Sequence, residues 1–83
     1  MAVRLAGMVI WFNQIQGHGL ICCGNDLEVI VHATAVRDER DRSLASGQHV
    51  EFSLAKSAWG WEARDVVKLA LDASSIPGYS SGL

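Results

Sequence analysis

A histidine ring between two glycines is the feature of this sequence best suited to contact a flat ligand. His18 stands between Gly17 and Gly19, so on an extended segment its ring would have neighbours without side chains. Glycine weakens a strand unless a ligand or another backbone approaches closely, or unless the chain bends sharply there. The sequence leaves two explanations open: a space for a ligand beside the ring, or a corner in a barrel.

Further rings occur at Trp11, His32, Trp59 and Trp61. Indole and imidazole rings stack on nucleobases, and each stacked base contributes about 1–3 kcal/mol without requiring charge. Imidazole also donates hydrogen bonds to base edges and, when protonated, contacts phosphate. Residue types alone leave a role of these rings in stacking on a ligand open. The alternatives are a structural, exposed role for Trp11, and packing of Trp59 and Trp61 on a barrel end or on each other.

The sequence offers no set of residues typical of a catalytic or metal site. No Ser–His–Asp set, carboxylate pair or phosphate-binding loop can be assembled, and His49 and Glu51 are simply neighbours on the polar face of a strand. Cys22 and Cys23 are adjacent, which suits reduced thiols, and their spacing to the histidines matches no zinc finger. We therefore expect no enzyme activity, no catalytic residue, no metal and no cofactor.

Composition points to one small soluble domain with a modest charge. The chain has 83 residues, 49% of them hydrophobic, but no apolar run long enough to span a membrane. Its N-terminus lacks the pattern of a signal peptide, so we expect a cytoplasmic protein with no membrane partner. The net charge of −2 argues against charge-driven binding of duplex nucleic acid, which depends on Lys and Arg contacts to phosphate.

Alternating apolar and polar residues predict short strands. The clearest alternation places Val50, Phe52 and Leu54 on one face of a strand. Trp11 directly followed by Phe12 predicts a bend that turns neighbouring rings to different faces. The expected strands are residues 3–13, 18–23, 28–32, 49–56 and 62–69.

Within these strands, alternation assigns side chains to the core or to the outside. Val9 is expected in the core, and Ala63 and Val66 are expected to point inward from the last strand. The second strand should place His18, Leu20 and Cys22 on one face, opposite Gly19, Ile21 and Cys23.

The connecting segments are expected to be loops and turns. Residues 13–17 and 57–61 are turns, and residues 33–36 form a single helical turn. Residues 37–46 carry six charges of balanced sign and predict a solvated loop held down by Leu44; the alternative is that Arg37, Arg40 or Arg42 reaches a phosphate. Residues 70–83, rich in Ser and Gly, predict a flexible tail after a domain of residues 1–69.

Four segments, GMVIWFN, QGHGLI, VIVHATAV and GQHVEF, resemble the cold-shock domain of bacterial cold-shock proteins and their eukaryotic relatives. The resemblance extends over residues 7–69 without a gap. It implies an all-β fold, a five-stranded antiparallel Greek-key barrel of the oligonucleotide-binding (OB-fold) type, which binds single-stranded RNA or DNA on an aromatic face. It also implies that Val29 and Val31 point to the core, and Ile30 and His32 to the ligand.

The departures from the family pattern fall on this binding face. Ile10 and Gln16 stand where basic residues are usual, and His18 replaces a Phe. Four other usual aromatic positions hold different residues: Leu20, Ile30, Ala33 and Asp41. Trp59 and Trp61 fall in the loop that borders the face in the family. The resemblance thus predicts a site made of Trp11, His18, Leu20, Ile30, His32, Trp59 and Trp61.

Two functions remain open at this point. The first is a single-stranded RNA or DNA binder that stacks bases, holds strands unpaired, and so acts as an RNA chaperone or a regulator of transcription or translation. The second is a divergent barrel whose apolar face, with Ile10, Leu20 and Ile30 around the rings, binds a protein partner or a second copy of the chain. In the second case nucleic-acid binding would be weak or lost.

Overall fold

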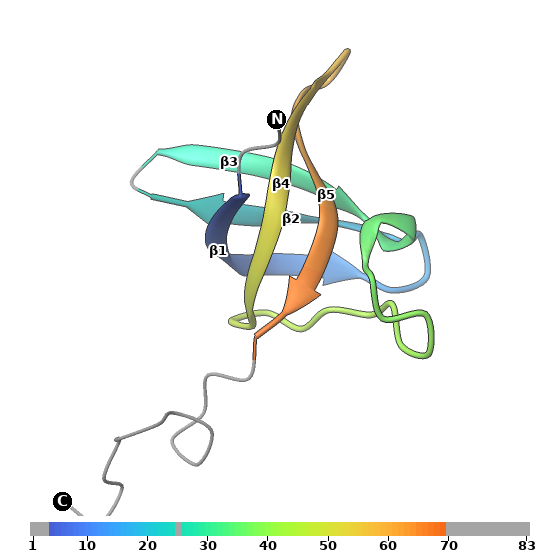
Figure 1. The fold of residues 1–83 in the computed structure, drawn as a ribbon. Coiled ribbons are helices and arrows are strands. Elements are labelled where there is room, and N and C mark those ends of the chain that lie inside the picture. The colour runs from blue at the N-terminus through green and yellow to red at the C-terminus, as the bar shows by residue number, and fades with distance from the viewer. Residues whose placement is uncertain (1–3, 25, 70–83) are drawn as a thin grey trace, which may run out of the picture.

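The computed structural model describes residues 4–24 and 26–69, which form a closed five-stranded barrel (Figure 1). The predicted all-β barrel is confirmed. No helix in these residues has the length and apolar character needed to cross a membrane. The elements are β1 (Arg4–Asn13), β2 (His18–Cys23), β3 (Leu27–His32), the 3-10 turn η1 (Ala33–Ala35), β4 (His49–Ser57) and β5 (Gly60–Lys68). The proposed tail, residues 70–83, lies outside the described part, so the division into domain and tail stays a prediction.

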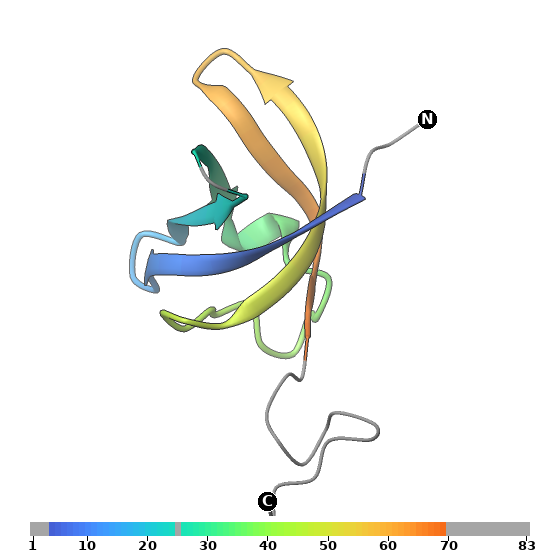
Figure 2. The ribbon, with the colours of Figure 1, turned by 90° about the vertical axis from the view of Figure 1, so that its left-hand side faces the viewer.

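The strands follow the order β1-β2-β3-β5-β4 around the barrel, and β4 pairs with β1 to close it. Four of the five pairings are antiparallel. The fifth, between β3 and β5, is a short parallel pairing in which Ile30 faces Glu62 and Val31 faces Ala63. The β4–β5 hairpin extends beyond the other strands as a curved ribbon (Figure 2). This extension places the hairpin tip beside the outer face of the sheet rather than within it.

Alternation along the strands builds the core. Val9, Ile21 and Phe52 are fully buried, as are the inward side chains of β3 that the family resemblance predicted. Leu44, in the loop that follows η1, is buried against the barrel, as predicted. Leu54, expected inward with Val50 and Phe52, is only partly buried because the hairpin begins to leave the barrel there. The buried set is Val9, Ile21, Val29, Val31, Val36, Leu44, Val50, Phe52, Ala63 and Val66.

Two irregularities in strand register decide where the outward side chains lie. The first falls between Val9 and Trp11, and it lets Trp11 point outward while the next residue, Phe12, packs against the core. The second lies on β5, opposite Glu51 and Ser53 of β4, where Asp65 adopts the left-handed region with φ 54°. It explains why Ala63 and Val66 both point inward despite their odd spacing.

Candidate functional site

The outer face of β1, β2 and β3 brings together most of the predicted site residues. Strand register aligns Trp11, Leu20 and Ile30 in one row across the three strands. The next row joins His18 directly to His32. Trp11 and His18 meet edge to face, with ring centroids 5.5 Å apart and planes at 79°. The two rows therefore make one continuous surface of rings and aliphatic side chains.

Trp59 adds a ring to this surface from the hairpin tip. Together with His18, Ile30 and His32, it lines an open pocket of about 490 Å³. Its indole is 81% exposed, so the structure does not bury it as a packing residue. The Ser57 hydroxyl accepts a hydrogen bond from the Trp59 backbone N–H at 3.2 Å and donates one to the Gly60 carbonyl at 3.1 Å, which shapes the turn. The pocket thus lies between a β-sheet floor and one ring from the hairpin.

Trp61 is placed differently from Trp59. Lys56, its cross-strand partner, holds its ammonium 5.0 Å from the indole centroid, within the range of a cation–π interaction. Trp61 is 39% exposed and does not line the pocket. The alternation of β5 puts it on the side opposite Glu62, whose partner in β3 is Ile30. Of the two indoles, the structure brings only Trp59 to the histidine pair.

The structure explains why glycines stand on both sides of His18, a question that the sequence left open. A Cβ on Gly19 would overlap the backbone carbonyl oxygen of Trp11 and lie 2.7 Å from the Phe12 ring. Gly17 has φ +74°, and its carbonyl accepts a hydrogen bond from Ala33 N–H at 2.9 Å. Close backbone approach and a tight turn explain both glycines, so the space for a ligand comes from the pocket rather than from the missing side chains.

The β1–β2 turn, predicted over residues 13–17 with Asn13 as one of its turn-forming ends, is ordered by the Asn13 side chain. Its side-chain oxygen accepts hydrogen bonds from the backbone N–H groups of Ile15 and Gln16 at 3.0 and 2.9 Å. An Asn that binds the backbone two or three residues ahead is a common turn former, which is the signal available in the sequence. Because Asn13 pairs with His18 across the strands, this turn also fixes the start of the histidine row.

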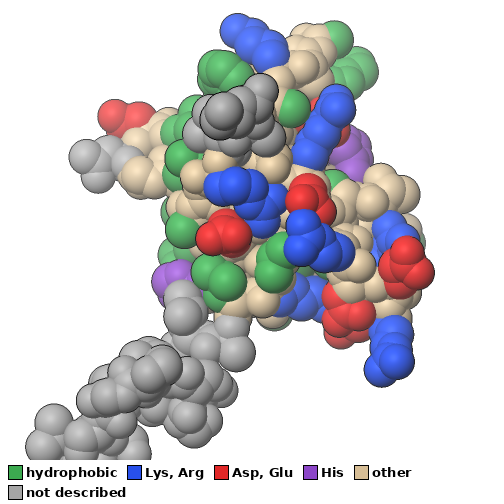
Figure 3. Space-filling model, in the orientation of Figure 1, with side chains coloured by type: hydrophobic (Ala, Val, Ile, Leu, Met, Phe, Trp, Pro, Cys, Tyr) green, Lys and Arg blue, Asp and Glu red, His purple; other side chains and the backbone are tan. Residues whose placement is uncertain are grey.

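Charged side chains concentrate on a different part of the barrel, which we call the charged side: Arg4, Arg37, Glu51 and Asp65. Arg37 donates two hydrogen bonds to the Asp65 carboxylate, at 2.9 and 2.5 Å. Arg4 contacts Glu51 at 3.2 Å and Asp65 at 3.4 Å, and also donates to the Asp65 carbonyl. Figure 3 shows basic and acidic side chains interleaved over β4 and β5.

These contacts change the acidity of the groups on the charged side. The hydrogen bonds from Arg37, and then its positive charge, lower the pKa of Asp65, and the same pair raises the pKa of Arg37. In the loop after η1, the Ser43 hydroxyl and backbone N–H lower the pKa of Asp41, with a further contribution from Lys68. Each shift favours the ionised form.

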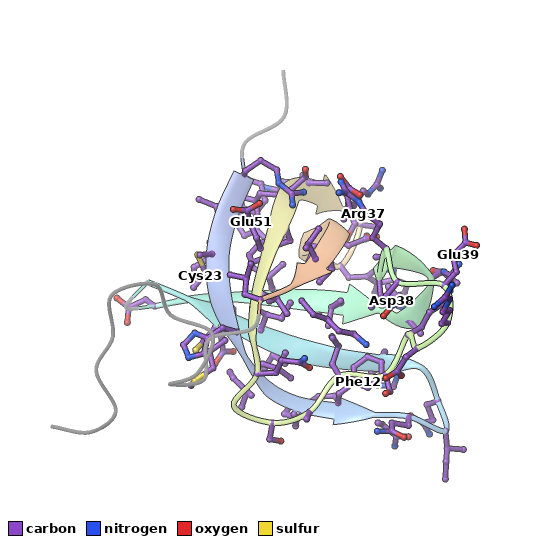
Figure 4. The ribbon with its side chains drawn as sticks, turned by 60° about the horizontal axis from the view of Figure 1, so that its bottom comes forward. Phe12, Cys23, Arg37, Asp38, Glu39 and Glu51 are labelled. Carbon is purple, nitrogen blue, oxygen red and sulfur yellow. The ribbon has the colours of Figure 1, made fainter. Side chains whose placement is uncertain are left out.

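The remaining Lys and Arg side chains also have hydrogen-bond, ion-pair or cation–π partners, except Arg40. Arg64 pairs with Glu62 at 3.7 Å, and Arg42 donates to the Thr34 carbonyl at 3.0 Å. Arg40 has no side-chain partner within the described residues, but the acidic residues Asp38 and Glu39 precede it directly, and Glu39 points away from the barrel (Figure 4). None of the seven Lys and Arg residues lines the pocket. The expectation of a largely solvated loop agrees with this placement.

The cysteines and acidic groups do not extend the site. Both cysteines are free thiols, and the Cys23 thiol donates to the Ala6 carbonyl at 3.3 Å. Within the described part of the chain, no three His, Cys, Asp or Glu residues gather closely enough to hold a metal ion. What the face offers chemically is ring surface, two imidazoles and exposed apolar groups such as Ile10.

Comparisons with known proteins agree with this geometry. The family model described as the 'Cold-shock' DNA-binding domain matches residues 5–69. Cold shock protein CspB of Geobacillus stearothermophilus is 41% identical over 63 residues, which cover 76% of this chain and 96% of the relative. Cold shock-like protein CspC of Bacillus cereus is 40% identical over 65 residues, covering 78% of this chain and 100% of the relative.

A solved structure supports the same fold at greater sequence distance. Drosophila Unr CSD456 superposes with a TM-score of 0.70 at 19% identity. The match covers 86% of this chain and 29% of the Unr chain. At this identity the likeness concerns the fold alone.

Proposed function

Because the chain belongs to the cold-shock domain family, whose members generally bind nucleic acid, we propose that it binds single-stranded RNA or DNA on the outer face of β1, β2 and β3. The observation that carries this proposal is the pocket in which His18, His32 and Trp59 converge. Proteins that bind single strands combine such ring platforms with a groove that follows the backbone. The family is in general non-catalytic, and we propose a non-catalytic role for this chain.

In this proposal, the rows of the sheet act as successive stacking platforms. Trp11, which is 42% exposed, presents an indole beside Leu20, and a base can lie on this pair. A second base enters the pocket, between the histidines and Trp59. Every base has a π face, so such stacking tolerates many sequences.

Binding of this kind has a direct consequence for folded RNA. The protein binds unpaired strand only, so it shifts the equilibrium of a hairpin toward its open form by mass action. A role as an RNA chaperone, or as a regulator of transcription or translation, would follow from this shift. Few cations adjoin the face, so we expect affinity to fall only slightly with salt, with a slope of about one phosphate contact.

The experiment that tests this function is a titration followed by tryptophan fluorescence. A short thymidine or uridine oligonucleotide should quench the emission to saturation, because indoles report directly on stacked bases. Replacing Trp11 by Ala should weaken binding by about tenfold, the lower part of the range for one stacked base. Circular dichroism of the variant checks that the barrel remains folded.

A matched control comes from the charged side. Arg37→Ala removes a cation that is 61% exposed and does not line the pocket, and it should change affinity less than twofold if the strand binds to rings. A large loss of oligonucleotide affinity in Arg37→Ala, together with no loss in Trp11→Ala, would show that the strand binds on the charged side and would overturn the proposal.

A second function, association with a protein or a second copy, is favoured by one observation. Met8, Ile10 and Trp11 each expose between 38% and 42% of their surface around the irregularity of β1, where Val9 between them is buried. In the same experiment, unchanged fluorescence together with a mass that rises with protein concentration would support this second function instead.

A further inference from the structure

The two histidines of the pocket form a direct cross-strand pair. His18 and His32 are partners in the antiparallel β2–β3 ladder, and both line the pocket with Ile30 and Trp59. Partner side chains in such a ladder share one face, with Cβ atoms about 4.5–5.5 Å apart. The pair therefore offers two neighbouring imidazoles to anything that enters the pocket.

The surroundings of this pair contain few charges. The elements next to it contribute Trp11 and Asn13 from β1 and Trp59 from the hairpin, none of which titrates between about pH 5 and 8. The β1–β2 turn and η1 carry no titratable side chain. The titratable and charged groups on the facing parts of β2, β3 and β5 are Cys22, Glu28, Glu62 and Arg64, the last two paired with each other at 3.7 Å.

A ligand with phosphates meets no dedicated cation in this pocket. The Lys and Arg side chains of the chain bind carboxylates, a carbonyl or an indole, except Arg40 on the loop after η1. Phosphate contacts normally come from such cations. Imidazole is the side chain that changes charge between about pH 5 and 8, so the histidine pair can supply the missing charge when protons are available.

We propose that His18 and His32 together form the phosphate contact of this face, and that they do so in protonated form, so that affinity for single strands rises as the solution becomes more acidic. This inference rests on the proposed function and adds to it a proton-dependent ligand contact. Nucleic-acid affinity is then a function of pH over the range in which imidazole titrates.

Proton binding and strand binding are expected to strengthen each other. A phosphate attracts an imidazolium group more strongly than a neutral imidazole, because the hydrogen bond is then charge-assisted. A phosphate between His18 and His32, which share one face of the β2–β3 ladder, therefore favours the protonated form of the rings. The complex consequently holds more protons than the free protein, which means that binding takes up protons and strengthens as pH falls.

The test uses the whole chain and a thymidine oligonucleotide, because thymine does not titrate in this range. At constant ionic strength, we expect binding to be about tenfold tighter at about pH 6 than at about pH 8. Calorimetry in two buffers of different ionisation enthalpy should detect uptake of about one proton per strand bound near pH 7. Proton uptake is a readout that a purely structural role of the histidines would not produce.

Two variants separate charge from stacking. The double change His18→Phe and His32→Phe keeps a ring at each position but cannot be protonated, so it should bind at both pH values with similar affinity and take up no proton. His49→Gln removes the third histidine, which does not line the pocket, and should keep the pH dependence of the parent. If the Phe pair disturbs folding, the pair His18→Gln and His32→Gln gives the same comparison.

The outcomes distinguish this inference from the function on which it rests. Binding that is independent of pH, or a pH dependence that survives in both double variants, would overturn the role of the histidines while leaving single-strand binding intact. Absence of binding at every pH would remove the proposed function itself. Loss of the pH dependence in His49→Gln would place the proton elsewhere on the barrel and would also overturn the inference.

Discussion

The charged side of the barrel and the face of β1, β2 and β3 use their side chains in opposite ways. On the charged side, Arg4 and Arg37 converge on Asp65 and tie three segments that are distant in the sequence. On the other face, Trp11 and Trp59 remain exposed, and no Lys or Arg lines the pocket. The charged side joins segments to one another, whereas the face of β1, β2 and β3 leaves its rings accessible to solvent.

This difference assigns two properties, the stability of the barrel and the contact with a ligand, to two different sides of the molecule. Ion pairs at the surface contribute modestly to stability, but they fix the position of the segments that carry them. Rings contribute binding energy to a ligand whether or not charge is present. We infer that this chain assigns its cations to the scaffold and relies on rings for recognition, which is why changes on the two sides should have separable effects.

The largest effect should come from a change beneath the ring-bearing face. In Gly19→Ala, the new methyl group would overlap the Trp11 carbonyl and press on Phe12. Overpacking of this kind should lower the free energy of unfolding by about 3 kcal/mol, measured by urea denaturation. Both Trp11 and His18 flank the strained point, so the ring surface itself should be disturbed.

Gly24→Ala is the matched control for that change. Gly24 also lies on the β2 side of the barrel, has φ +68°, and would meet no atom within 4 Å. Only the backbone conformation opposes the substitution, so the cost should be about 1 kcal/mol. Equal costs for the two alanines would mean that the Gly19 contact is relieved by movement, and the two explanations for the glycine would be open again.

An intermediate effect is expected from the hairpin indoles. Trp59→Ala should weaken binding of a thymidine oligonucleotide by about tenfold, because it removes a stacking surface from the pocket. Trp61→Ala removes an indole that lies under Lys56 and outside the pocket, and we expect a loss of no more than about twofold. A greater loss in Trp61→Ala would show that the strand follows the other side of the hairpin.

The smallest effect should come from the charged side. Asp65→Asn keeps a residue that tolerates the left-handed backbone but removes the charge that Arg37 and Arg4 contact. We expect a decrease of at most a few degrees in the thermal midpoint at neutral pH, with oligonucleotide affinity unchanged.

The pH dependence of this variant follows from the acidity of Asp65. Arg37 lowers the pKa of Asp65 in the folded protein, so the contribution to stability is present above the unfolded value of about 4. It is lost as the pH falls from there through the lower folded value. Thermal melts of the parent and of Asp65→Asn should therefore converge below about pH 4. A difference that persists in acid would contradict the assigned ion pair.

Alternation in the sequence predicted the interior of the barrel well, because burial enforces a period of two on each strand. Val50 and Phe52 follow that pattern directly, and the bend at Trp11 was visible as two adjacent rings. The 3-10 turn of residues 33–35 and the buried Leu44 were also predicted. The family resemblance supplied the barrel topology, which no local pattern contains.

The outer surface was harder to predict because it depends on contacts between distant residues. Trp59 and Trp61 look equivalent in the sequence, and only the curvature of the hairpin brings one of them to His32. The role of Asp65 was missed, although the odd spacing between the inward Ala63 and Val66 signals an irregular strand around it. The contribution of the predicted site residues to binding stays a prediction.

The route of the chain around the barrel has a consequence for how the fold is assembled. The first three strands form one contiguous sheet, yet they close only against a hairpin that follows the loop after η1, and Arg4 pairs with a residue 49 positions later. A break in that loop would leave two pieces, each with one apolar side open to water and no core of its own. We therefore expect folding to be cooperative, with neither half stable on its own, so that the ring-bearing face forms only in the completed barrel.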